Sequence, residues 1–214
     1  MAKRLPGHVG NLLAGHDGTD HQIAYVDSNG NLYVAKSTTT QEQFPAVAAT
    51  ELTRPSDTTA YAIGDAIANS TTGSAVVPLQ FTVARANSFT GRVIGAQIVT
   101  DSATAFGAIR LHLFDTTPFA AAGFQADNAA LALTYTALTT GSAGTSPHYL
   151  GYIDFQTFVA ESASAVAIGA CDQTELVFDC AASSQVVFGL LEARAAFTPA
   201  SGQKFTVALD VIQG

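Results

Sequence analysis

The stretch TRPSDTTAYAIGDAIANS, residues 53–70, decides the fold because it leads into the β-rich part of the chain. Pro55 fixes its own φ angle and pushes Arg54 toward extended geometry. Asp57 and the two threonines that follow it favour a turn closed by hydrogen bonds between side chain and backbone. Residues 60–67 then show a strand pattern, with one flexible point at Gly64. The stretch therefore predicts an extended lead-in, a turn and a strand.

After this stretch, strand patterns follow one another at fairly even spacing. The clearest alternations turn two sets of side chains inward: Phe205, Val207, Leu209 and Val211 in residues 204–212, and Ile109, Leu111 and Leu113 in residues 108–115. Further strands are expected at residues 76–84 (with Val77, Leu79, Phe81 and Val83 on one face), 92–100 (with a bulge or bend at Gly95), 130–137, 149–155, 176–178 and 185–197. With the strand near Tyr61, these make about eight to nine strands, which suits a β sandwich and a jelly roll in particular.

The first part of the chain, residues 1–50, is polar and rich in turns. Asn29-Gly30 predicts a hairpin turn, because a type I′ turn needs positive φ at both central positions. The β-prone flanks are residues 23–26 and 32–34, and a hairpin this short is marginal in water by itself. It must lie on its own β domain, on a neighbouring subunit or on a shell. The sequence thus predicts an N-terminal arm with a hairpin (residues 1–50) and a jelly-roll-like β sandwich (residues 51–214).

Several of these motifs resemble segments of virion surface proteins from tailed bacteriophages. The family pattern TRPxDTTAYxxGDxI matches residues 53–67, and its later strands match RLHLFD at residues 110–115 and YLGYIDF at residues 149–155. A second, shorter match joins DGT at residues 17–19 to DxxGxLxV at residues 27–34. The resemblance covers roughly residues 50 to 214. It implies a capsid decoration (head cement) protein, and it implies no catalytic residue.

The composition is compatible with a protein that lives inside an assembly. Charged residues make up 12% of the chain, against about 25% in an ordinary soluble domain. The formal net charge is −8 and the nine basic residues are scattered, which argues against a nucleic-acid partner because a phosphate backbone needs clustered Lys and Arg. The small, uncharged side chains that cover such a surface suit close packing against other subunits.

No targeting or membrane segment is expected. Leu5-Pro6-Gly7-His8 follows the basic start of the chain in place of an apolar region, and no window approaches the ~18 apolar residues of a membrane span. We therefore expect synthesis in the host bacterial cytoplasm, followed by incorporation into the virion at the capsid surface. In that compartment Cys171 and Cys180 are expected as free thiols rather than as a disulfide.

Candidate chemical groups are few. His16 and His21 lie near Asp17 and Asp20, but in a Gly-rich stretch without the supporting hydrogen bonds that a metal site needs. Asp154 and Glu161 are conceivable as the paired carboxylates of a glycosidase, yet the chain has no Trp to line a sugar cleft. Nucleophile, phosphate-loop and zinc-protease motifs are absent from the sequence. We expect no enzyme activity, no cofactor and no metal.

Contact residues are expected in turn-rich segments that carry apolar side chains. They are Ile23, Tyr25, Leu32 and Tyr33 on the hairpin, with Phe119 and Phe124 in the long loop 116–128. A second long loop spans residues 139–147. Asp127 is expected to cap one helical turn after the first loop.

The expected function is to bind the outer surface of a phage capsid and to stabilise it by bridging major capsid subunits. A homotrimer is the expected form, because local three-fold points offer three equivalent sites. The alternative is a head-fibre, tail-surface or receptor/glycan-binding module. A cytoplasmic enzyme on a jelly-roll scaffold is the third class.

Overall fold

The computed structural model describes residues 13–16, 21–26, 32–36, 44–102, 107–117, 125–133, 149–171, 175–181 and 183–213. The chain divides into an N-terminal unit, residues 1–43, and a main unit, residues 44–214. Within the described residues the regular elements are antiparallel β strands and one short 3₁₀ turn, η1 (Gly73–Ala75). The predicted all-β class is confirmed.

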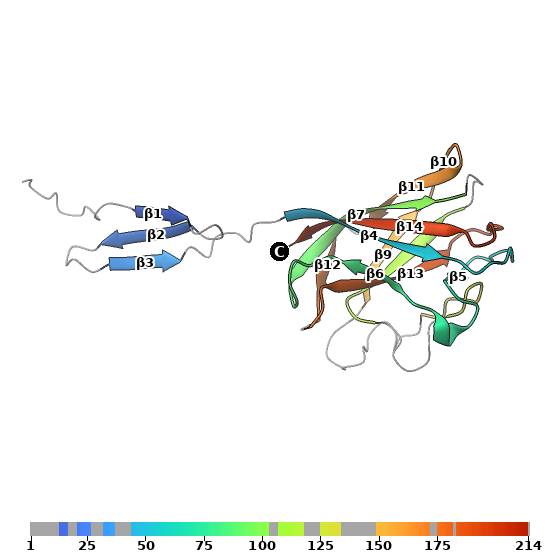
Figure 1. The fold of residues 1–214 in the computed structure, drawn as a ribbon, viewed down its shortest axis with the longest axis horizontal. Coiled ribbons are helices and arrows are strands. Elements are labelled where there is room, and N and C mark those ends of the chain that lie inside the picture. Colours follow the sequence, from blue (N-terminus) through green and yellow to red (C-terminus); the bar gives the residue numbers. More distant parts are fainter. Residues whose placement is uncertain are drawn as a thin grey trace, which may run out of the picture. The chain divides into compact units, whose positions relative to one another are not determined.

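The N-terminal unit contains one three-stranded sheet (Figure 1). Its strands are β1 (Leu13–His16), β2 (His21–Val26) and β3 (Leu32–Lys36), in the order β1-β2-β3. The register pairs Tyr25 with Tyr33 and Val26 with Leu32, so the predicted pairing of the two hairpin flanks is confirmed. The Asn29-Gly30 turn itself lies outside the described residues. Strand β1 was not predicted.

The main unit begins at Phe44, earlier than the expected boundary near residue 50. Strand β4 (Phe44–Thr53) pairs along its whole length with β14 (Lys204–Gln213), from Phe44 opposite Gln213 to Thr53 opposite Lys204. Residues 44–50 therefore belong to the main sheet and not to an arm. The sequence FPAVAATELT has too few large apolar residues to show a period of two, and its partner strand lies at the other end of the chain.

The main sheet has the order β4-β14-β7-β11-β9-β8-β13-β5, with β12 on β7, β10 on β11 and β6 on β13. The bounds of the remaining strands are β5 (Ala66–Ile67), β6 (Leu79–Thr82), β7 (Thr90–Thr100), β8 (Ile109–Phe114), β9 (Tyr149–Phe155), β10 (Val159–Glu161), β11 (Ser164–Cys171), β12 (Leu176–Asp179) and β13 (Val186–Ala193).

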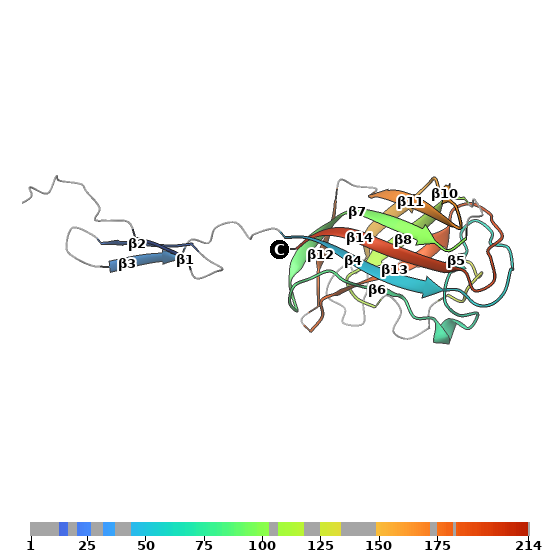
Figure 2. The ribbon, with the colours of Figure 1, turned by 45° about the horizontal axis from the view of Figure 1, so that its top comes forward.

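This sheet turns back on itself at β11 and forms two layers (Figures 1 and 2). Residues 165–169 pair with β7, whereas Ala170 and Cys171 pair with β9. Strands β4, β14, β7 and β12 make the first layer, and β9, β8, β13 and β6 make the second. At the crossing, a Cβ on Gly169 would lie 2.6 Å from side-chain atoms of Ile153 and Phe155, so only glycine lets the strand pass this close. The arrangement is sandwich-like.

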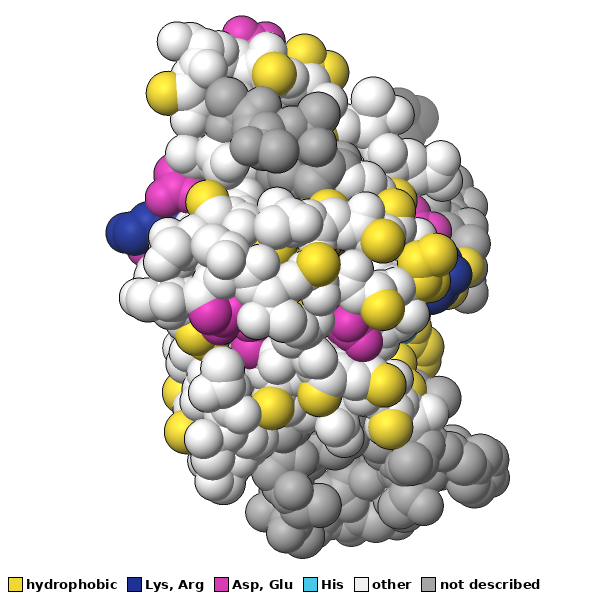
Figure 3. Space-filling model, turned by 90° about the vertical axis from the view of Figure 1, so that its right-hand side faces the viewer, with side chains coloured by type: hydrophobic (Ala, Val, Ile, Leu, Met, Phe, Trp, Pro, Cys, Tyr) yellow, Lys and Arg dark blue, Asp and Glu magenta, His cyan; other side chains and the backbone are white. Residues whose placement is uncertain are grey.

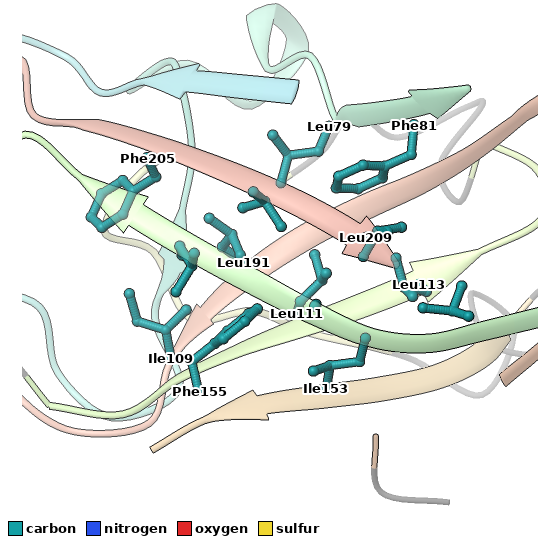
Figure 4. Close-up of a cluster of buried hydrophobic side chains, with 14 of the residues drawn as sticks. Leu79, Phe81, Ile109, Leu111, Leu113, Ile153, Phe155, Leu191, Phe205 and Leu209 are labelled. Carbon is teal, nitrogen blue, oxygen red and sulfur yellow. The ribbon is translucent and has the colours of Figure 1, made fainter. Parts of the chain in front are cut away.

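The core fills the space between the two layers (Figure 4). The predicted alternations on β8 and β14 are confirmed, because Ile109, Leu111, Leu113, Phe205, Val207, Leu209 and Val211 are all buried. Fully burying one such side chain stabilises the fold by about 1.5–3 kcal/mol. The alternation thus sets which face of each strand turns toward the other layer.

Three predicted strands come out differently. Residues 60–67 form only an isolated bridge at Tyr61, opposite Phe197, and the two-residue β5. In residues 130–137 the described part has a single bridge, at Ala130. Strand β6 starts at Leu79, so Val77 lies before it and is exposed. The hairpin of β10 and β11 was not predicted, because it is rich in Ala, Gly and Ser and lacks a clear apolar period.

The irregularity expected at Gly95 is present. The β7–β14 register pairs Asp210 with Gly95 but Val211 with Val93, which leaves Ile94 as the extra residue of a bulge. Val93 stays buried and Ile94 turns outward. The bulge keeps the buried residues on both sides of it on the core face.

Candidate interaction surface

The 53–70 stretch is anchored by a buried group of three side chains. Arg54 Nη2 donates to Asp127 Oδ2 at 2.8 Å, and both side chains have no exposed area. Tyr61 Oη donates to Asp127 Oδ1 at 2.5 Å, and Arg54 Nε donates to Tyr61 Oη. The same carboxylate accepts the backbone N–H of Ala68 at 2.8 Å. A buried charge is tolerated only when it is paired and hydrogen-bonded in this way.

This group joins three distant parts of the chain. Arg54 Nη1 donates to the carbonyl of Ala200 at 3.3 Å, and the Tyr61 ring packs against Phe197 with 4.9 Å between centroids. Asp127 brings in the loop before Ala130. The helical turn expected at Asp127 is wrong, because its carboxylate points into the core and Asn128 has φ of +59°. The turn predicted at Asp57 is confirmed, since its carboxylate accepts the N–H of Thr59 at 3.0 Å.

The protonation of this group is set by its surroundings. Burial tends to lower the pKa of Arg54, but the hydrogen bond to Asp127 and the nearby charges raise that pKa above its ordinary value. Burial, with help from Asp127, raises the pKa of Tyr61 well above its ordinary range. Tyr61 therefore stays protonated and Arg54 stays charged at any physiological pH. The group therefore has a structural role: it holds the 53–70 stretch against the segments that contain Asp127 and Ala200.

A second polar group lies on the side of β8, β9 and β13 that faces away from the core. Arg110 forms two hydrogen bonds with Asp154, at 2.7 and 2.8 Å, and its guanidinium lies 3.6 Å from the centroid of the Tyr152 ring. The hydrogen bond to Asp154, opposed by burial, raises the pKa of Arg110. Asp154, one of the two carboxylates considered as a glycosidase pair, is thus held by arginine.

His112 connects the same three strands. Its Nε2 lies 2.9 Å from Glu192 Oε2, and its Nδ1 lies 3.0 Å from Tyr149 Oη. Arg194 Nη1 donates to Glu192 Oε1 at 3.1 Å. A hydroxyl, a histidine and a carboxylate in series are the components that activate a nucleophile. Here both ring nitrogens of His112 and both carboxylate oxygens of Glu192 have hydrogen-bond partners, and the two side chains are nearly buried. The arrangement therefore links the three strands and serves a structural role.

The third feature is an exposed apolar surface on the first layer, which we call the aliphatic face. Its residues alternate with buried neighbours on their strands, so they point away from the core. Ile168 is 80% exposed and Val177 is 64% exposed. Four β-branched residues from four strands make up the face: Val47 on β4, Ile94 on β7, Ile168 on β11 and Val177 on β12.

Two ion pairs lie beside the aliphatic face, and one exposed carboxylate lies within it: Asp210 on β14 is opposite Val47 on β4 and Gly95 on β7. Lys204 Nζ donates to Glu51 Oε1 at 2.9 Å, and Arg92 Nη1 donates to Glu175 Oε2 at 2.8 Å. Figure 3 shows one end of the main unit, where hydrophobic side chains are spread among uncharged ones, several Asp and Glu side chains are exposed, and Lys and Arg are sparse.

The predicted contact residues lie elsewhere. Ile23, Tyr25 and Tyr33 occupy positions on one face of the N-terminal sheet, because Tyr25 pairs with Tyr33 and Ile23 is two residues from Tyr25. Leu32 pairs with Val26 and so occupies the opposite face. Phe119 and Phe124 lie outside the described residues. Sequence reasoning missed the aliphatic face, although its β-branched residues at outward positions of strands were a usable signal.

Within the described residues, no group of three or more His, Cys, Asp and Glu side chains is placed to hold a metal ion. His16 and His21 occupy paired positions at the end of the β1–β2 ladder, while Asp17 and Asp20 lie outside the described residues. The described part of the chain also contains no helix with the length and hydropathy of a membrane span.

Cys180 is a free, buried cysteine, as expected from the sequence. Burial, followed by the charges of Asp179 and Asp115, raises the pKa of the Cys180 thiol to about 11. A thiol with so little thiolate at neutral pH is unreactive. The side chain of Cys171 lies outside the described residues.

No family model, no curated protein and no solved structure matches this chain. The two polar groups and the aliphatic face are therefore interpreted from their own chemistry. Within each polar group, the charged side chains form hydrogen bonds and ion pairs with other residues of the fold. The aliphatic face is the feature that a partner would bury with a gain in free energy.

Proposed function

We propose that this chain is a structural protein of a tailed-phage virion, which binds the outer surface of the capsid and stabilises it by bridging major capsid subunits. The observation that supports the binding role is the aliphatic face, with four exposed β-branched side chains and two ion pairs beside it. The phage assignment comes from the resemblance of residues 53–70, 110–115 and 149–155 to virion surface proteins.

The proposed protein stabilises the shell by binding to it, without any chemical reaction. A protein that binds the assembled shell and not its separated subunits stabilises the shell by linkage, by about 2.7 kcal/mol per site at a hundredfold excess over the dissociation constant. A jelly-roll-like sandwich and a homotrimer belong to this proposal. Three copies around a local three-fold point would multiply weak contacts, and the N-terminal unit would serve as an arm toward a neighbour or the shell.

The buried Arg54–Tyr61–Asp127 group fits this role. It fixes the 53–70 segment against the loop at Asp127 and the segment at Ala200, which gives the main unit a rigid frame. Rigid surfaces bind with a smaller loss of conformational entropy than mobile ones. A shell lattice repeats the same geometry at every equivalent position, so a rigid binding surface fits each of these positions in the same way.

The deciding measurement is the copy number of this chain relative to the major shell protein in purified particles, by quantitative mass spectrometry. We expect a ratio of about one to one or a simple fraction of it, because equivalent lattice points repeat with the shell symmetry. A few copies per hundred shell subunits would favour the fibre or tail alternative. Absence from the particle would end the proposal.

A further inference from the structure

One carboxylate lies among the apolar side chains of the aliphatic face. Asp210 on β14 is exposed, and the strand register places it opposite Val47 on β4 and Gly95 on β7. A Cβ on Gly95 would lie 3.4 Å from Asp210 Oδ2, so the carboxylate leans toward β7, where Ile94 turns outward at the bulge. A charge thus lies between the strands that carry two of the four β-branched residues of the face.

The basic residues on this layer are paired with other carboxylates. In the described parts of β4, β7, β11, β12 and β14 they are Arg92 and Lys204. Arg92 Nη1 donates to Glu175 Oε2 at 2.8 Å, and Lys204 Nζ donates to Glu51 Oε1 at 2.9 Å. Among the described residues, the carboxylate of Asp210 has no hydrogen-bond or ion-pair partner. In the free protein this exposed charge is therefore solvated by water.

Covering the aliphatic face would change the free energy of this charge. A carboxylate that loses its water without gaining a partner costs far more free energy than a neutral polar group does. Burial of the neighbouring apolar side chains stabilises a complex, but an unpaired charge buried among them offsets that gain. A partner of the aliphatic face must therefore pair with Asp210, and a surface that cannot do so is rejected.

The surrounding charges favour a cation over a neutral donor as this partner. Among the described residues, acidic side chains outnumber basic ones on the outward side of the first layer, where Asp179 at the end of β12 is a second exposed carboxylate. The whole chain has a formal net charge of −8. Negative patches meet positive groups in complementary interfaces, and a charge-assisted hydrogen bond is about twice as strong as a neutral one. A Lys or Arg side chain is therefore the group that fits Asp210 best.

We propose that the shell surface covering the aliphatic face is apolar and presents one Lys or Arg side chain to Asp210. In this arrangement Asp210 determines specificity. The β-branched side chains supply affinity for any apolar surface, and the carboxylate selects a surface with a cation at the matching position. The inference rests on the proposed function, since it takes the shell as the partner. It goes beyond that function because it gives the chemistry of the partner's contact surface.

The sign of one substitution tests the inference. Asp210→Val replaces the carboxylate with a β-branched apolar side chain, so it enlarges the aliphatic face and removes the charge. The measurement is co-sedimentation of full-length variants with purified shells that lack this chain. We expect Asp210→Val to bind at least about thirtyfold more weakly than wild type, because the partner's cation is then buried without a counterion. Binding as tight as wild type, or tighter, would overturn the inference, since a carboxylate that meets no cation only opposes burial.

Three further variants isolate the effect of the charge at this position. Asp210→Glu keeps a carboxylate and should stay within about fivefold of wild type. Asp210→Asn keeps the shape of the side chain without its charge, and it gives the same test if thermal unfolding shows that Asp210→Val is not folded. Glu161→Gln removes an exposed carboxylate on β10, outside the aliphatic face, and should bind like wild type. Equal weakening by Asp210→Val and Glu161→Gln would overturn the inference, because it would show a response to net charge alone.

The outcomes distinguish the inference from the proposed function. If Ile168→Asp weakens binding and Asp210→Val does not, the aliphatic face is the contact surface and the shell presents no cation there, which overturns the inference alone. Wild-type protein that does not bind shells overturns both. Self-association of the wild type without shells, if it is lost in Asp210→Val, assigns the cation to a second copy of this chain and overturns the shell as its source.

Discussion

At the scale of single residues, Asp127 is important for stability, because its loss would leave the buried Arg54 charge with Asp57, at 3.4 Å, as its remaining acidic partner. We expect Asp127→Ala to lower the free energy of unfolding by about 3–5 kcal/mol, as measured by urea denaturation. Asp57→Ala is the matched control. Asp57 also pairs with Arg54, but at 3.4 Å and with its side chain 31% exposed, so its loss should cost less than about 1 kcal/mol. Equal effects of the two substitutions would contradict this account.

Glu192 makes stability depend on pH. Burial acts to raise the pKa of Glu192, but His112 and Arg194 outweigh it and lower that pKa below its ordinary value of 4.5. A lowered pKa in the folded state gives stability that is present above pH 4.5 and is lost as the pH falls through the folded-state pKa. The difference in unfolding free energy between wild type and Glu192→Gln should therefore shrink below pH 4.5. A difference that stays constant down to pH 3 would refute the prediction.

Among the strands, β11 is the one that makes two layers out of one sheet. A Cβ on Gly169 would lie 2.6 Å from atoms of Ile153 and Phe155, and these core side chains have little room to move. Gly169→Ala should destabilise the main unit by about 1–3 kcal/mol, measured as a lower midpoint of thermal unfolding. Gly95→Ala is the control on β7, because its nearest contact would be 3.4 Å, to Asp210 Oδ2. We expect that variant to stay within about 0.5 kcal/mol of wild type.

For the molecule as a whole, substitutions on the aliphatic face should affect binding to shells without affecting the stability of the fold. Ile168 is mostly exposed, so Ile168→Asp should change stability by less than about 0.5 kcal/mol. It should weaken binding to shells at least about tenfold, because it replaces buried apolar area with a desolvated charge. The control is Thr71→Asp, at an exposed position beside η1. If both variants bind shells like wild type, the face is not the contact surface.

Local sequence pattern by itself determined the strands with a strong period of two and the turns with specific chemistry. Strands β8, β9 and β14 and the turn at Asp57 follow from residues close together in the chain, because side-chain alternation and local hydrogen bonds need no distant partner. The same holds for the pairing of β2 with β3 around Asn29-Gly30. The all-β class follows from these elements.

The tertiary structure alone decided the features that depend on distant partners. Asp127 became the counterion of Arg54, β4 joined the sheet through the last strand of the chain, and β11 passed from β7 to β9 between Gly169 and Ala170. The aliphatic face belongs with them, since an outward position becomes a surface only when nothing in the fold covers it. Pairing and exposure are properties of contacts far apart in sequence, and no local pattern encodes which two segments will meet.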